Sequence, residues 1–303
     1  MKQTLKPTIF FGSGPVAAKS LALLRVWHPV SLVVTKRTPP HHKEPAPVEL
    51  YAKTNNLPIT YADTKQELDE LSLPDANYGI VIDYGVIISE HVIQHFPRGI
   101  INSHFSLLPQ WRGADPITYA LLSGQSQSGV SLMIIDKGMD TGPLIATKAL
   151  PIAANDTNQT LTEKLLLLSD KLLQATLPRY VQSEVLPTPQ PHTIATYSQK
   201  LTKQSGILNS NKLASELARE VRAFAGWPGS RLCYNNVWLT VTQAVASNLA
   251  VPVGTLVFHG SALHYGCKNG SLQITELQPA GKNKMSATAF YNGYAHKLSL
   301  TKM

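Results

Sequence analysis

The chain has 303 residues, a length that fits two domains, or one large one, better than one small module. Hydrophobic residues make up 43% of the chain and the mean hydropathy is -0.06, which excludes a disordered chain and a membrane-embedded one. The net charge is +8, with 16 basic and 16 acidic side chains in residues 1–190 but 11 and 3 in residues 191–303. The whole excess of positive charge therefore lies in the C-terminal part.

Over the first half of the chain, apolar runs typical of strands alternate with segments typical of helices. The expected strands are 8–12, 30–35, 78–83, 99–104 and 129–136, and the expected helices between them are 15–27, 48–55 and 89–95. This βαβ alternation predicts an α/β fold with an N-terminal doubly wound, mostly parallel sheet of the Rossmann-like kind. A leucine-rich helix over 160–177 is expected to close this domain and to end before Pro178.

Closely spaced prolines between Val185 and Thr193 predict an extended linker at the point where the charge balance changes. We therefore divide the chain into a domain over 1–184, a linker over 185–199 and a basic domain over 200–303. After one helix at 211–224, the third part contains short apolar runs separated by Gly, Asn and Pro, which predict a small, OB-like β-barrel. Its charge indicates a module that binds a polyanion such as nucleic acid, with a solubilising surface as the alternative.

Other features of the sequence argue against a membrane span, a secretion signal and a structural zinc site. No apolar run approaches the ~18 residues that span a bilayer, and the opening MKQTLKPTIFF lacks a secretion signal, so we expect a cytoplasmic protein. Cys233 and Cys267 form no CxxC pattern, which argues against a structural zinc site. The turn Gly12 to Pro15 resembles the start of a phosphate-binding loop, but without a third glycine a plain strand-to-helix turn is favoured over a dinucleotide site.

Asn102 and His104 stand two residues apart where an expected strand ends. Their side chains share one face, and together they offer a donor and a proton-transfer group to a carbonyl oxygen that becomes negative. Asp140, in the loop Lys137 to Gly142, follows another expected strand. If the two strands are neighbours, its carboxylate meets His104 and orients the imidazole. Structural roles for Asn102 and His104, and a turn-stabilising role for Asp140, are the alternatives.

The run NSHFSLLPQWRGADPI, followed by MDTG, resembles the folate-dependent formyltransferase superfamily. Three segments in the C-terminal part, TYSQKLTK, RAFAGWPGS and LQPAGKNKMSA, are similar to the branch whose acceptor is methionine esterified to initiator tRNA. The resemblance implies transfer of a formyl group from 10-formyltetrahydrofolate to the α-amine of that methionine, for translation initiation. It also implies that no metal takes part, and we expect a monomer.

The resemblance assigns roles to particular residues. Asn102, His104 and Asp140 match the catalytic trio of the family, with the first two as donors to the oxyanion and Asp140 as the group that holds His104 in position. The folate-contacting segments correspond to Ser106, Leu107, Leu108 and Pro109, and to Tyr84, Gly85, Val86 and Ile87. Contacts with tRNA phosphates are expected from Lys36, Arg37, Lys43, Lys200, Lys203, Lys282 and Lys284.

Three features depart from the family pattern. Phe105 stands where the family has a smaller residue, and Asp83 replaces an alanine before Tyr-Gly, which adds a carboxylate near the pterin pocket. The basic loop Lys36 to Pro47 is shorter than its counterpart in the family. The alternatives within enzymes are a formyltransferase for a sugar amine and a 10-formyltetrahydrofolate hydrolase. A non-catalytic RNA-binding protein is the alternative of another class, but it gives no reason for the trio.

Overall fold

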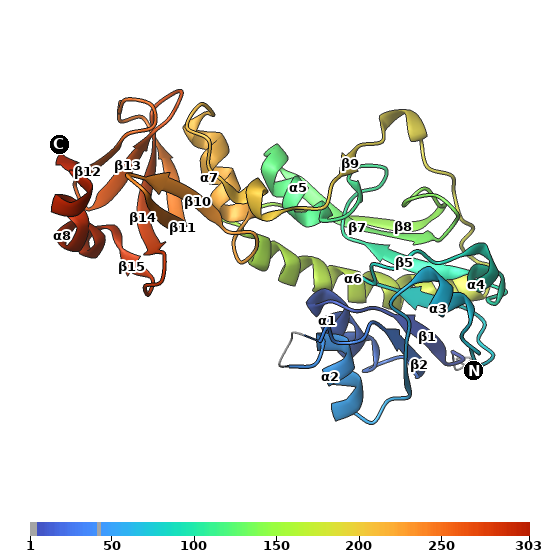
Figure 1. Cartoon of the computed structure of the whole chain (residues 1–303). Helices are drawn as coiled ribbons and strands as arrows, with labels where there is room; N and C mark the ends of the chain where they lie inside the picture. Colours follow the sequence, from blue (N-terminus) through green and yellow to red (C-terminus); the bar gives the residue numbers. More distant parts are fainter. Residues whose placement is uncertain (1–4, 41–43) are drawn as a thin grey trace. The chain divides into compact units, whose positions relative to one another are not determined.

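The computed structural model describes residues 5–40 and 44–303. The chain forms two compact units (Figure 1). Unit 1 consists of Met1–Pro116, Gln127–Pro151 and Thr162–Ser198, and unit 2 consists of Ile117–Ser126, Ile152–Leu161 and Gln199–Met303. Each unit is therefore built from three separate stretches of chain.

The described part of unit 1 is organised around a seven-stranded sheet in the order β3-β2-β1-β4-β5-β7-β8. The strands are β1 (Thr8–Phe11), β2 (Val30–Thr35), β3 (Ile59–Tyr61), β4 (Gly79–Val81), β5 (Ile100–His104), β7 (Gln127–Ile134) and β8 (Leu144–Pro151). The first five strands in this order are parallel, whereas β5 and β7, and β7 and β8, pair antiparallel. The predicted doubly wound, mostly parallel sheet is confirmed, with an antiparallel edge that the sequence pattern did not indicate.

Four helices of unit 1 pack in two pairs (Figure 1). Helix α1 (Pro15–Leu24) packs on α2 (Pro47–Thr54), and each begins with a proline at its first turn, where a missing N–H costs nothing. Helix α3 (Lys65–Asp69) packs on α4 (Glu90–Gln94), and the hydroxyl groups of Thr64 and Ser89 cap these two helices. The central strand β1 is buried along its whole length, as expected for a strand covered on both faces.

The long helix α6 (Asn158–Val181) contains Pro178, so the prediction of an end before this residue was wrong. The last turn forms because one of its side chains, Tyr180, is anchored in the interior. Tyr180 is 7% exposed and donates a hydrogen bond from its hydroxyl to the carbonyl of Arg98 at 2.8 Å. Packing therefore outweighs the hydrogen bond that the proline removes. Among helices of the described residues, including α6, none combines the length and the apolar character needed to cross a bilayer.

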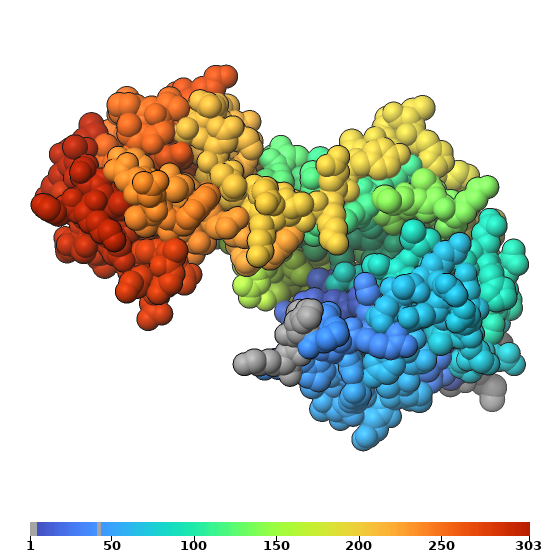
Figure 2. All heavy atoms as spheres, viewed as in Figure 1, coloured from blue at the N-terminus to red at the C-terminus, as the bar shows by residue number. Residues whose placement is uncertain are grey.

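The proline-rich segment 185–198, predicted as part of a linker, packs on unit 1. Thr188 pairs with Leu144 of β8, and β9 (Tyr197–Ser198) pairs in parallel with β6 (Arg112–Gly113). Between them lies a short 3-10 helix, η1 (His192–Ile194). In Figure 2 the atoms of this segment, in yellow, lie against the green atoms of unit 1. Its course brings Gln190 into the interior, where it is only 4% exposed.

Unit 2 is organised around a curled sheet in the order β10-β11-β14-β13-β12-β16, with β15 paired to β14. The strands are β10 (Ser230–Tyr234), β11 (Val237–Ser247), β12 (Leu256–His259), β13 (Ala262–Gly266), β14 (Ser271–Pro279), β15 (Met285–Ser286) and β16 (Thr301–Lys302). Helix α7 (Ala214–Ala223) packs on β11 and β14, and η2 (Lys203–Gly206) precedes it. Helix α5 (Pro116–Ser123) falls almost wholly in this unit.

A further helix of unit 2, α8 (Ala287–Leu298), was missed by the sequence interpretation, which expected only strands after α7. Its sequence contains Thr288, Asn292 and Gly293, which have low helix propensity. The helix forms because Ser286 caps it and because Phe290 and Leu298 are buried, at 0% and 1% exposure. It packs on β13 and β14.

Candidate active site

The end of β5 carries two of the predicted site residues on one face. Ser103, between them, points to the opposite face and shares a hydrogen bond with Ser169 of α6 at 2.7 Å. Asn102 and His104 therefore face away from α6, as the two-residue period of a strand requires. His104 is 7% exposed and Asn102 is partly exposed, so both side chains are shielded but remain at the surface of the sheet.

Asp140 reaches this face by an unexpected route. Because β7 is antiparallel to β5, Ile134 at the end of β7 lies beside Ile101, at the beginning of β5. The loop after β7 must therefore fold back over the sheet, and Asp140 within it has a φ of 51°. The sequence interpretation placed both strand ends close together. The side chains do meet, but across the face of the sheet.

The Asp140 carboxylate is the centre of the site. Its Oδ1 accepts a hydrogen bond from Asn102 Nδ2 at 3.3 Å, and its Oδ2 accepts one from the backbone N–H of Gly113 at 2.7 Å. Oδ2 also lies 3.7 Å from His104 Nδ1. The structure thus brings the three predicted residues together, with the carboxylate held in one orientation by two donors.

Both nitrogens of His104 face polar groups of the protein. Nε2 lies 2.8 Å from the carbonyl oxygen of Trp111, which can only accept, so Nε2 carries a hydrogen in this arrangement. Nδ1 faces Asp140. For His104 to donate from Nε2 to a substrate oxygen, that hydrogen must leave the Trp111 carbonyl. Trp111 itself has a φ of 57°, an uncommon conformation for a large side chain.

Two buried side chains that were not among the predicted site residues support the Asp140 loop. Gln190 Nε2 donates to the carbonyls of Asp140 and Gly142, at 3.0 and 2.7 Å. Gln190 Oε1 accepts from Arg112 Nε and Nη2, at 3.2 and 2.7 Å. Arg112 is 1% exposed, and its other side-chain contact is His192 Nδ1 at 3.0 Å. No spacing in the sequence links Gln190, within an apparent linker, to a loop 50 residues earlier.

The SLLP segment that the resemblance assigns to folate lies directly after β5. Ser106 and Leu108 are turned inward, at 1% and 6% exposure. Ser106 Oγ donates to Gln110 O at 2.5 Å, and Ser131 Oγ links the segment to β7 by accepting from Leu108 N and donating to Ser106 O. Pro109 is also buried, so Leu107 is the member of the segment that keeps partial exposure.

The second folate segment, Tyr84 to Ile87, follows β4, whose last residue, Val81, pairs with Asn102. Tyr84 is buried and donates its hydroxyl hydrogen to Ala62 O at 3.0 Å. Val86 is partly exposed, Gly85 adopts a φ of 70°, and Ile87 is 76% exposed. A ligand beside Asn102 would therefore meet backbone and an apolar side chain here.

Asp83, the departure from the family pattern, sits at the start of α1. Its side chain remains accessible to solvent but is surrounded by protein on most sides. This desolvation, together with the charge of Asp115, raises the pKa of Asp83 to about 6, against a lowering effect of the Ala17 backbone N–H. A Cβ on Gly14 would lie 2.1 Å from the Asp83 carboxylate. A protein carboxylate thus occupies the place where a dinucleotide phosphate would bind, which favours the plain turn.

The residues predicted to contact tRNA differ in their surroundings. Lys36 is partly exposed, whereas Arg37 forms ion pairs with Asp63 and Glu67, at 2.7 and 2.6 Å, which raise its pKa. Lys43 lies outside the described residues. Lys200, Lys203, Lys282 and Lys284 are exposed, and Lys284 also pairs with Glu276 at 2.6 Å. Their role in tRNA binding stays a prediction.

Two further features bear on the sequence interpretation. Phe105 is 7% exposed and packs inward directly after His104, so the larger residue is accommodated within the protein. In residues 5–40 and 44–303, no group of three His, Cys, Asp or Glu side chains is arranged to hold a metal ion.

Comparison with known proteins gives consistent matches over nearly the whole chain. Residues 26–177 match the formyl transferase family and residues 200–295 match the formyl transferase C-terminal domain. The methionyl-tRNA formyltransferase of Myxococcus xanthus is 34% identical over 96% of this chain and 95% of its own length. That of Halorhodospira halophila is 36% identical over 82% of each chain.

Solved structures share the fold at lower identity. WlaRD, a sugar 3N-formyl transferase, has a TM-score of 0.68 and 19% identity, with 93% of this chain and 100% of that chain covered. HypX from Aquifex aeolicus, in complex with tetrahydrofolic acid, has a TM-score of 0.65 and 15% identity, covering 98% of this chain and 48% of that one. These likenesses confirm the fold.

Proposed function

Because this chain belongs to the formyl transferase family, we propose that Asn102, His104 and Asp140 are its catalytic residues. The chain carries out folate-dependent transfer of a formyl group to methionyl-tRNA. In finer detail, the donor is 10-formyltetrahydrofolate and the acceptor is the α-amine of methionine on initiator tRNA. The enzyme works in the cytoplasm as a monomer, on a product destined for translation initiation.

The surroundings of the trio suit a flat, partly apolar donor. Ile87, at 76% exposure, and Met139, at 67%, present apolar side chains in the two loops next to the trio. Leu107 adds a third, partly exposed apolar side chain in the segment after β5. When bound, the folate supplies the formyl group to the amine. The chain's own contribution is to place that group beside Asn102 and to stabilise the charge that develops on its oxygen.

Asn102 is the best-placed donor for that oxygen. Its Nδ2 has two hydrogens and donates one of them to Asp140, so the second can donate to the formyl oxygen. Asp140 fixes the orientation of the Asn102 amide and lies beside His104 Nδ1. As the amine forms its bond to the formyl carbon, the bond from that carbon to the folate nitrogen breaks, and the proton that the amine loses passes by way of the Asp140 carboxylate to that nitrogen. His104 donates to the oxygen when its Nε2 hydrogen leaves Trp111.

Exposed lysines of unit 2 hold the acceptor. Lys200, Lys203 and Lys282 lie in the part of the chain that carries the whole excess of positive charge. Long-range attraction to tRNA phosphates requires only such exposed charges.

The observation that carries this proposal is the contact of one carboxylate with both Asn102 and His104. The test is formylation of methionyl-tRNA by the full chain with 10-formyltetrahydrofolate. Removing one oxyanion donor lowers turnover by roughly 100- to 1000-fold, and we expect losses of this size for Asn102→Ala and His104→Ala. The exposed His91 of α4 provides the control variant His91→Ala, which should keep full activity.

Wild-type turnover in either site variant would refute the assignment of that residue. Release of formate without tRNA would instead indicate a hydrolase, and transfer to an amino sugar in place of methionyl-tRNA would indicate the other alternative. Each product is distinguished by following a labelled formyl group into tRNA, free formate or sugar.

A further inference from the structure

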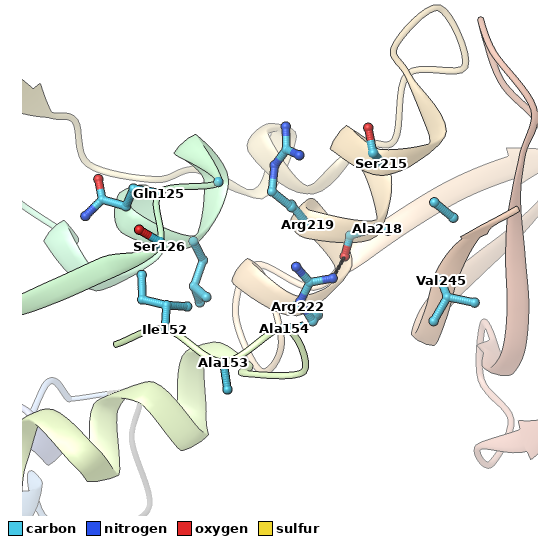
Figure 3. Close-up of a pocket in the computed structure, with 13 residues that line it drawn as sticks. Gln125, Ser126, Ile152, Ala153, Ala154, Ser215, Ala218, Arg219, Arg222 and Val245 are labelled. Atoms are coloured by element: carbon cyan, nitrogen blue, oxygen red, sulfur yellow. Dashed lines mark hydrogen bonds between the residues drawn. The ribbon is translucent and has the colours of Figure 1, made fainter. Parts of the chain in front are cut away.

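Unit 2 contains a cavity of about 420 Å³ that no member of the catalytic trio lines (Figure 3). One wall is a single face of α7, where Ser215, Ala218, Arg219 and Arg222 follow the i, i+3, i+4, i+7 spacing. The other walls come from residues 124–126, from 152–154 and from β11. The volume falls within the range of about 300–1000 Å³ that is usual for small-ligand sites.

Two arginines give the cavity its chemical character. Arg219 Nε donates to Leu122 O, and Arg222 Nη1 donates to Ala218 O, both at 3.2 Å. Within the described part of the chain neither guanidinium forms an ion pair with a carboxylate. Each group has five N–H donors, so most of this donor capacity is left for a ligand.

Arg222 carries a more specific sign of a missing partner. Its Nε is buried and has no hydrogen-bond partner among the described residues. A buried donor left in this state is destabilising, and native proteins contain few of them. In Figure 3 both side chains extend from α7 toward the segments 124–126 and 152–154.

The electrostatics of the cavity favour an anion. Desolvation and the like charge of Arg219 lower the pKa of Arg222, and the charge of Asp156 opposes this effect. The Asp156 carboxylate is engaged elsewhere, because it accepts from Ala153 N at 2.7 Å and from Thr160 Oγ1 at 2.9 Å. Two neighbouring cations thus remain without a carboxylate at ion-pair distance.

We propose that this cavity is a phosphate site, in which Arg219 and Arg222 each donate to a phosphate oxygen. The planar guanidinium fork matches phosphate geometry, which a lysine would not. The source we favour is a backbone phosphate of the acceptor tRNA, because unit 2 holds most of the basic C-terminal part. This choice of source rests on the proposed function, whereas the phosphate chemistry does not.

The first measurement is tRNA affinity at several salt concentrations for the full chain and three variants. Arg222→Met should weaken binding by about 10- to 100-fold, as expected for a hydrogen-bonded charge. It should also lower the log-log salt slope by roughly 0.7 to 0.9, the contribution of one phosphate. Arg222→Lys keeps the charge but loses the fork, and should lose most of the same affinity. The exposed Lys171 lies in unit 1 and does not line the cavity, so Lys171→Met should change affinity by less than about 2-fold.

The second measurement is thermal stability with inorganic phosphate, using chloride at equal ionic strength as the control. Phosphate should raise the melting temperature of the wild type and not that of Arg222→Met, because a ligand stabilises only the state that binds it. The melting curve without phosphate also shows whether each variant folds. Arg219→Met provides a second variant in case Arg222→Met does not fold.

The outcomes separate the possibilities. Loss of both responses in the arginine variants supports a tRNA phosphate. A phosphate response in the wild type with unchanged tRNA affinity in the variants overturns the tRNA source and assigns the site to free phosphate. Absence of both effects overturns the site altogether. A wild type that does not formylate methionyl-tRNA refutes the proposed function, and the phosphate measurement still decides the nature of the cavity.

Discussion

Gln190 provides a direct test of how the Asp140 loop is held. The variant Gln190→Met keeps the length of the side chain but removes two hydrogen bonds to the carbonyls of Asp140 and Gly142. It also removes the acceptor that Arg112 contacts through Nε and Nη2. Because Gln190 is 4% exposed and Arg112 is 1% exposed, water cannot readily replace these partners.

The expected magnitude follows from these contacts. A neutral hydrogen bond contributes about 1 kcal/mol net and a bond to a charged group about 1.5–3 kcal/mol, so unfolding should become easier by about 3–5 kcal/mol. In a unit of about 150–250 residues, each kcal/mol lost from the free energy of unfolding lowers the melting temperature by about 2–4 °C. The expected decrease for this variant is therefore roughly 6–20 °C. Displacement of Asp140 by about 1 Å should lower turnover by about 100-fold.

A second variant separates the two halves of this network. Gln190→Glu keeps an acceptor for Arg112 but loses the donor to the carbonyls of Asp140 and Gly142. It should therefore retain more stability than Gln190→Met and still lose turnover, with the KM for tRNA little changed. The matched control is Gln182→Met, at an exposed glutamine of the same unit. Turnover within about 2-fold of wild type in both Gln190 variants would show that the loop keeps its position without this anchor.

Two further predictions concern pH and salt. Burial and Asp115 raise the pKa of Asp83 to about 6. Between about pH 4 and about pH 6 the folded chain therefore holds a proton that the unfolded chain has released, and the stability of the fold falls as the pH rises through this interval. Asp83→Asn should melt above wild type near pH 7.5 and lose this advantage near pH 4, and a lower melting temperature at both pH values would contradict the reasoning. Reversing two exposed charges together, by Lys200→Glu and Lys203→Glu, should raise the KM for tRNA more than it changes turnover at saturating tRNA. The measurement is steady-state kinetics at two salt concentrations, and an unchanged KM would contradict the prediction.

The sequence predicts the part of the site that depends on a local pattern. The alternation of β5 places Asn102 and His104 on one face regardless of the rest of the fold. The direction of β7 cannot be predicted in this way, because an apolar run such as 129–136 has the same composition in a parallel and an antiparallel strand. The route by which Asp140 reaches the site therefore appears only in the structure.

Other differences arise where tertiary burial overrides local preference. Pro178 should end a helix, and Gly293 should weaken one, but buried Tyr180 and Phe290 stabilise α6 and α8 at these places. The role of Gln190 could not be predicted, because the prolines on both sides of it indicate an exposed linker. Its function depends on partners 50 and 78 residues earlier in the chain.

The division of the chain into interleaved stretches limits how the protein can be cut. The backbone passes from one unit to the other after residues 116, 126, 151, 161 and 198. Cleavage after Ser198 would therefore leave 117–126 and 152–161 on the N-terminal fragment, separated from the rest of unit 2. The C-terminal fragment would keep the main hydrophobic core of unit 2, which extends from Leu208 to Leu300, but it would lose two walls of the cavity beside α7.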